Sequence, residues 1–172
     1  MANEFDLSGI LKAALDLQHF CEIRNWNFCF ICGLAVQPWG DPRATQDADL
    51  SLLTGFGNEE AFVDQLLSEY KPRRENALEY RVLLLWSHDG IALDIALGAL
   101  PFEEISIKRS VKCPIAPGHE LKICTPEDLI VHKAFASRDR DWADIDMVLL
   151  RQERRLNITQ IFEDLSPLVD LK

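Results

Sequence analysis

The segment from Phe28 to Leu53 places the strongest constraint on the fold. It opens with an apolar run, Phe28–Cys32, which predicts a buried strand that ends at Gly33. After a short helical or turn segment, the chain reaches Asp47 and Asp49 on a second apolar strand. Residues two apart on a strand point to the same face, so these two carboxylates are expected side by side. They repel each other unless a cation lies between them, and Mg²⁺ with a phosphate chain is the usual occupant.

Composition indicates a globular protein and disfavours several functional classes. The chain has 172 residues, of which 48% are hydrophobic, and this predicts one domain over residues 1–172. The N-terminal stretch lacks the pattern of a signal peptide, and no apolar run is long enough to span a membrane, so a cytoplasmic location is expected. The formal net charge of −10 disfavours broad, non-specific nucleic-acid binding, but it allows a local basic patch or a basic protein partner.

The five cysteines have irregular spacing, which is typical of reduced thiols that pack as small hydrophobes. Cys29 and Cys32 form a C-x-x-C pair, and two interpretations of it are open. A redox or zinc site is one; burial in the core of an apolar strand is the other. Positions three apart on a strand face opposite ways, and no second pair stands at zinc-finger spacing, so the core interpretation is favoured.

Hydrophobic periodicity predicts the remaining elements. Two apolar strands around Asp89-Gly90 indicate a hairpin, and Pro101–Cys124 reads as a meander of short strands that includes Ile105–Lys108. Lys71–Glu75 is expected to be a charged turn, in which Arg73 or Arg74 either faces solvent or holds polyphosphate or RNA. The expected helices are 7–23, 59–70, 127–137 and 157–168. Their apolar spacing predicts inward-facing residues, which are Phe62, Val63, Leu66 and Leu67 in the second helix and Ile158, Ile161, Phe162 and Leu165 in the last.

Asp94 interrupts the second hairpin strand, which is otherwise aliphatic. A charged side chain in such a run is costly unless it is paired or bound to a cation. The alternative is that Asp94 lies on an edge strand and faces water. The flanking residues have the pattern of a buried strand, which favours a paired or cation-bound carboxylate.

These motifs resemble the nucleotidyltransferase (polymerase-beta-like) superfamily, whose signature is an apolar strand, a Gly-Gly or Gly-Ser turn and Asp-x-Asp on the next strand. Gly-Leu-Ala-Val, Trp-Gly, Pro-Arg-x-Thr and Asp-x-Asp-Leu are similar to its bacterial AbiEii/MenT-like branch, which includes toxins of toxin–antitoxin systems. The resemblance runs, with gaps, from about Phe28 to Leu150. Cys32 departs from it, because this residue stands where the first glycine of the pair is expected.

The resemblance implies an α+β nucleotidyltransferase fold: a mixed, mostly antiparallel sheet with helices packed on it and a C-terminal helical segment. It also implies a catalytic, Mg²⁺-binding set formed by Asp47, Asp49 and Asp94. The backbone amide of Gly33 would face the phosphates of an NTP, and Lys133 would reach them, although a snorkelling helix lysine is the alternative.

Four further residues are assigned through the same resemblance. Arg43 would neutralise the triphosphate or, alternatively, pair with Asp41 or Asp47. Thr45 is interpreted as a loop hydroxyl that orients Asp47. The Arg-Asp-x-x-Asp motif contributes Asp141 and Asp144, for which a structural role at a helix start is weighed equally with a catalytic one.

The resemblance implies transfer of an NMP from an NTP to a hydroxyl acceptor with Mg²⁺ as cofactor. In that branch the acceptor is a tRNA end or a protein side chain, and an antitoxin is an expected partner. Two alternatives are kept. One is a catalytically weak nucleotide-binding regulatory module, motivated by Cys32; the other is an enzyme that modifies an antibiotic, for which the acidic charge favours a cationic substrate.

Overall fold

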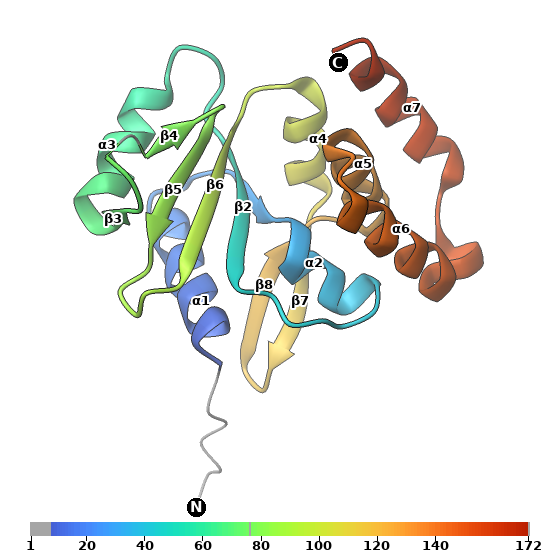
Figure 1. Cartoon of the computed structure of the whole chain (residues 1–172), viewed down its shortest axis with the longest axis horizontal. Helices are drawn as coiled ribbons and strands as arrows, with labels where there is room; N and C mark the ends of the chain where they lie inside the picture. The colour runs from blue at the N-terminus through green and yellow to red at the C-terminus, as the bar shows by residue number, and fades with distance from the viewer. Residues whose placement is uncertain (1–7, 76, 172) are drawn as a thin grey trace, which may run out of the picture.

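The computed structural model describes residues 8–75 and 77–171, which form a mixed sheet with helices packed on it (Figure 1). The strands are β1 (Phe28–Phe30), β2 (Asp47–Leu53), β3 (Lys71–Pro72), β4 (Leu78–Glu79), β5 (Val82–Trp86), β6 (Ala92–Gly98), β7 (Val111–Ala116) and β8 (His119–Ile123). The helices are α1 (Gly9–Glu22), α2 (Cys32–Trp39), α3 (Glu59–Glu69), α4 (Pro101–Arg109), α5 (Pro126–Ala136), α6 (Asp139–Gln152) and α7 (Ile158–Val169), with a 3₁₀ turn η1 (Glu153–Arg155).

The sheet runs in the order β3-β5-β6-β2-β1-β8-β7, and β4 pairs with β5 outside this path. Two neighbouring pairs, β2–β6 and β1–β8, are parallel, and the other pairs are antiparallel. The C-terminal helices lie beside the sheet, where α6 and α7 each pack against α5. The α+β class, the mixed and mostly antiparallel sheet, and the C-terminal helical segment are therefore confirmed.

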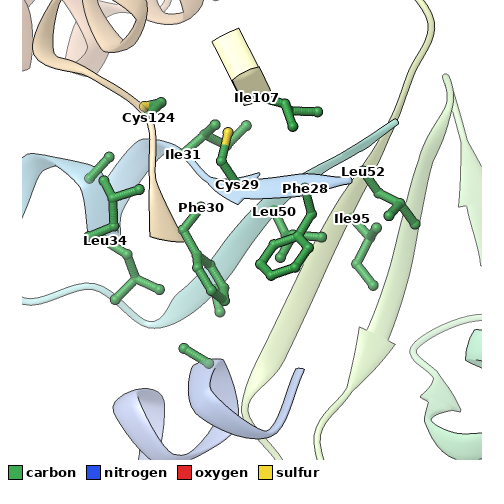
Figure 2. Close-up of a cluster of buried hydrophobic side chains, with 14 of the residues drawn as sticks. Phe28, Cys29, Phe30, Ile31, Leu34, Leu50, Leu52, Ile95, Ile107 and Cys124 are labelled. Carbon is green, nitrogen blue, oxygen red and sulfur yellow. The ribbon is translucent and has the colours of Figure 1, made fainter. Parts of the chain in front are cut away.

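Strand β1 passes through the hydrophobic core, which explains its unbroken apolar sequence. All three of its residues are buried, and Figure 2 shows them among aliphatic side chains from β2, β6, α2 and α4. Cys29 is fully buried in this cluster, as the core interpretation of the C-x-x-C pair predicts. The burial anchors the β1–α2–β2 unit, on which the first two candidate carboxylates are carried.

The hairpin around Asp89-Gly90 is confirmed as β5 and β6, with Gly90 in the left-handed region at φ 76°. The predicted strand at Ile105–Lys108 is wrong, because these residues belong to α4. Pro101 starts that helix, and the Glu103 carboxylate accepts hydrogen bonds from the backbone N–H groups of Ala99 and Leu100, which directly precede the helix. These local capping contacts outweigh the β-branched residues that suggested a strand.

Three smaller expectations also differ from the structure. The predicted turn at Lys71–Glu75 contains the edge strand β3, which pairs with β5. On the predicted inward faces of the helices, Ile158 and Phe162 are 46% and 64% exposed, and Leu67 is 39% exposed. Amphipathic spacing predicts the helices, but the burial of each residue depends on how much of the helix is covered by neighbouring elements, which the spacing does not show. Within the described ranges, no helix is both long enough and apolar enough to cross a bilayer.

Candidate active site

Two neighbouring parallel strands bring three carboxylates together. In the register of β2 with β6, Asp49 lies directly opposite Asp94, and Asp47 stands two residues earlier on β2, so it shares the same face. One ligand oxygen from each of the three residues lies within 4.8 Å of the others. The structure thus assembles Asp47, Asp49 and Asp94, named here the acidic triad, from positions more than forty residues apart in the sequence.

The acidic triad carries more negative charge than its surroundings neutralise. Burial raises the pKa of Asp49 to about 7, and the neighbouring carboxylates of Asp47 and Asp94 add to this effect. Burial also raises the pKa of Asp94, although an ion pair with Arg73 opposes the shift. Three convergent carboxylate oxygens are the donor set that Mg²⁺ prefers, and bound cations would relieve the repulsion. The residues present therefore fit a divalent metal.

The N-terminus of α2 lies beside the acidic triad because β1 leads directly into the helix. Gly33 is required there, since a Cβ atom at this position would overlap the side-chain oxygen of Thr45. The Thr45 hydroxyl donates a hydrogen bond of 3.2 Å to a carboxylate oxygen of Asp47. Backbone N–H groups in the first turn of a helix lack intrahelical acceptors, so this end favours an anion.

Cys32, the first residue of α2, adopts φ 51°, in the left-handed region that favours glycine. The backbone therefore keeps the conformation expected of a Gly-Gly turn although a cysteine occupies the position. Its thiol lines the same cleft as the acidic triad, and burial raises its pKa to about 12, so it remains a neutral thiol. A cysteine in place of the expected glycine therefore adds a side chain at this turn, but the backbone keeps the left-handed conformation.

On the opposite wall of the cleft, α5 and α6 form a buried ion-pair network. Lys133 is 2% exposed, and its ammonium lies 3.0 Å from Asp141 and 2.7 Å from Asp144. Arg43 donates two hydrogen bonds to Asp144, at 3.0 and 2.9 Å, and Arg138 lies 2.7 Å from Asp141. We call these five residues the α5–α6 brace. Its cations link the 43–46 loop to both helices.

The α5–α6 brace neutralises its own carboxylates. Burial alone would raise the pKa of Asp141, but hydrogen bonds from Arg138 and Lys133 hold it below the usual value. Burial is likewise overcome at Asp144, where hydrogen bonds from Arg43 and Lys133 lower the pKa. Asp141 and Asp144 therefore act as structural partners, as one of their two interpretations predicts. Arg43 does pair with an aspartate, but with Asp144 and not with Asp41 or Asp47.

The acidic triad and the brace face one cleft of about 510 Å³. Two further arginines lie near this cleft: Arg140, for which the sequence predicts no role of its own, and Arg73, for which it leaves open exposure to solvent or contact with polyphosphate or RNA. Arg140 lines the cleft and is exposed, and among residues 8–75 and 77–171 it makes no hydrogen bond or ion pair. Arg73 reaches the acidic triad through Asp94. The full lining is Cys32, Gly33, Arg43, Ala44, Thr45, Gln46, Asp47, Asp49, Asp94, Lys133, Arg138, Arg140 and Asp141.

No protein-family model matches the sequence, and no curated protein is found to be similar to it. Solved structures do resemble it. The crystal structure of ANT(2″)-Ia in complex with adenylyl-2″-tobramycin aligns with a TM-score of 0.62 at 12% identity, over 95% of this chain and 99% of that one. An antigenic nucleotidyltransferase-like protein from Paracoccidioides brasiliensis aligns with a TM-score of 0.57 at 16% identity, over 95% and 88% of the two chains. The chain therefore has the nucleotidyltransferase fold.

Proposed function

We propose that the protein is a Mg²⁺-dependent nucleotidyltransferase that moves an NMP from an NTP to a hydroxyl acceptor and releases pyrophosphate. The observation that carries this proposal is the acidic triad, whose three carboxylates converge beside the N-terminus of α2. Nucleotidyl transfer needs little covalent help from protein; it needs in-line positioning and neutralisation of the phosphate charge. A cleft lined by the acidic triad and by basic side chains supports the proposal.

Each residue in the cleft has a defined task in this proposal. Asp47, Asp49 and Asp94 would hold one or two Mg²⁺ ions, which, when bound, neutralise the reacting phosphate and the attacking and leaving oxygens. Thr45 fixes the rotamer of Asp47 through its hydroxyl, and Gly33 lets the backbone amides at the start of α2 approach the phosphates. Ionised carboxylates are the form that holds a metal, so a bound cation would lower the raised pKa of Asp49.

The basic residues of the cleft would act on the triphosphate in two ways, by direct contact or through their charge alone. Lys133 and Arg43 line the cleft, but both are already paired with aspartates of the α5–α6 brace. They would therefore act on the triphosphate through their positive charge, without direct contact. Arg140 has no ionic partner within the described part of the chain and projects from the first turn of α6. We therefore assign direct phosphate contact to Arg140 and a supporting role to Lys133 and Arg43.

Labelled transfer tests the proposal directly. The protein is incubated with Mg²⁺ and each α-labelled NTP, together with total RNA or with cell lysate as the source of acceptors. Transfer of label to a defined acceptor is expected, and its loss on addition of a chelator is the matched control. Absence of both label transfer and calorimetric NTP binding would contradict the proposal. If the protein is a toxin of a toxin–antitoxin system, the expected acceptor is a tRNA end or a protein side chain, and the expected partner is an antitoxin.

A small-molecule acceptor is the second candidate, because ANT(2″)-Ia is described as an antibiotic-resistance factor and shares the fold over nearly its whole length. The net charge of −10 favours a cationic acceptor. Expression in a sensitive host separates the two candidates: raised resistance to an aminoglycoside supports the small-molecule acceptor, whereas arrested growth supports an RNA or protein acceptor. A regulatory module with weak catalysis, the remaining alternative, predicts NTP binding without transfer to any of these acceptors.

A further inference from the structure

Arg73 is the cation paired with the acidic triad, and the sheet places it there. The backbone N–H of Arg73 donates to the carbonyl of Leu84 on β5, at 3.0 Å. Leu84 pairs with Asp94 on β6, and Asp94 pairs with Asp49 on β2. Arg73, Leu84, Asp94 and Asp49 thus form one row across neighbouring strands of the sheet, with Arg73 directly after β3. The guanidinium spans the β5 position to form an ion pair with the Asp94 carboxylate.

The environment of Arg73 holds it less firmly than the α5–α6 brace holds its cations. Among the described residues its guanidinium forms one ion pair, with Asp94, and it lies 5.7 Å from the centre of the Trp86 ring. Its Nε atom is buried without a hydrogen-bond partner among the described residues. The side chain is 20% exposed, so water reaches one side of the pair. A cation with one partner and an unsatisfied donor is easier to displace than a fully bonded one.

The Asp94 oxygen that accepts from Arg73 belongs to a carboxylate that the proposed function also assigns to the metal. A divalent ion held by all three carboxylates competes with the guanidinium for that charge, since both cannot neutralise Asp94 at full strength. The displaced guanidinium belongs to the residue that directly follows β3, so its positive charge stays near the site. That charge disfavours a bare divalent ion and favours one that arrives with an anionic triphosphate.

We propose that Arg73 is a replaceable counter-cation of the acidic triad: it neutralises Asp94 in the metal-free protein and yields the carboxylate to the metal when a nucleotide binds with it. The consequence is coupling. Metal alone binds weakly, nucleotide strengthens metal binding, and by linkage the metal strengthens nucleotide binding by the same factor. This inference rests on the proposed function, because it concerns the metal that the same site would hold.

Calorimetric titration with Mn²⁺, in the presence and absence of a non-hydrolysable NTP analogue, tests the inference without any measurement of activity. Arg73→Gln is expected to bind Mn²⁺ alone about tenfold more tightly than the wild type, because the competing cation is gone. The analogue should then strengthen Mn²⁺ binding less in Arg73→Gln than in the wild type. Asp94→Asn should weaken Mn²⁺ binding in both conditions.

Arg74→Gln is the matched control. It removes the same charge from the adjacent residue, whose partner is the exposed carboxylate of Glu79, and its Mn²⁺ affinity should stay within about twofold of the wild type. Should Arg73→Gln fail to fold, Arg73→Met keeps an unbranched stem beside Trp86 and is expected to show the same tightening.

The outcomes separate the two proposals. Equal or weaker Mn²⁺ binding by folded Arg73→Gln overturns the counter-cation role and leaves the nucleotidyltransferase proposal standing. Equal tightening in Arg74→Gln also overturns it, because a general charge effect would then explain the result. Failure of the wild type and of Arg73→Gln to bind Mn²⁺, with or without the analogue, overturns both proposals.

Discussion

The acidic triad and the α5–α6 brace contain the same chemical group in opposite electrostatic settings. In the brace, three cations surround two aspartates, and the pKa of each aspartate falls despite burial. In the acidic triad, three aspartates share one cation, Arg73, and the pKa of Asp49 rises to about 7. A cluster in which every carboxylate has cationic partners supports the fold, whereas a cluster with unpaired carboxylates is prepared for a cationic ligand. This difference distinguishes the structural aspartates from the candidate metal ligands.

The largest effect is expected from removal of the central carboxylate of the triad. Asp49→Asn should lower nucleotidyl transfer about a thousandfold, because a metal held by the triad contributes several kcal/mol to catalysis. The measurement is label transfer under saturating Mg²⁺ and NTP. Asp89→Asn, at the exposed tip of the β5–β6 hairpin, is the control and should retain wild-type activity. Retention of more than a tenth of the activity by Asp49→Asn would remove the triad from the mechanism.

The next effect concerns the brace and falls on stability. Lys133→Met leaves Asp141 and Asp144 buried without their shared partner, so the free energy of unfolding should fall by about 3–5 kcal/mol. Urea denaturation measures this loss. Lys108→Met is the matched control, because Lys108 forms an exposed pair with Glu104 and its loss should cost less than about 1 kcal/mol. Similar losses in both variants would contradict the comparison between a buried and a solvated pair.

A third prediction uses the pH dependence of stability. The folded-state pKa of Asp49, about 7, lies above its ordinary value of 3.8, so the folded protein retains a proton that the unfolded chain has lost. Stability associated with Asp49 is therefore present below pH 4 and is lost as the pH rises towards 7. Asp49→Asn should raise the free energy of unfolding by roughly 1–3 kcal/mol at pH 8 and change it little at pH 4.

Thermal unfolding at both pH values checks this prediction, and Mg²⁺ supplies its control. Excess Mg²⁺ should stabilise the wild type at pH 8 and should stabilise Asp49→Asn less, because the variant lacks one ligand. If Asp49→Asn is destabilised equally at pH 4 and pH 8, the carboxyl is not the source of unfavourable charge in the folded protein.

The smallest effect is expected at the α2 turn. Cys32→Gly should raise transfer activity several-fold, because the phosphates can approach the backbone more closely without the side chain. Relief of the left-handed conformation is offset by the greater flexibility of glycine in the unfolded chain, so stability should change by less than about 1 kcal/mol. Steady-state kinetics should show the change in the KM for NTP. An unchanged or higher KM would indicate that the thiol does not obstruct the approach.

Much of the fold follows from local patterns in the sequence. The apolar run at Phe28, the Asp-Gly turn at Gly90 and the Thr-Pro start of α5 predict β1, the β5–β6 hairpin and α5 because each depends on neighbouring residues. The strand expected at Ile105–Lys108 failed because a glutamate cap and an N-terminal proline favour a helix there. On the inward faces of α3 and α7, only Leu67, Ile158 and Phe162 were incorrectly placed, because how much of a helix is covered depends on tertiary packing.

The sequence by itself determined the candidate residues: a pair of acids two apart on a strand, a third acid within an aliphatic strand, and a glycine in the first turn of α2. Only the tertiary structure decided which charges remain free. Lys133, Arg43, Asp141 and Asp144 neutralise one another, and Arg73 meets Asp94 from another segment. The physical reason is that the charge state of a buried group depends on partners brought close by packing, and those partners lie far away along the chain.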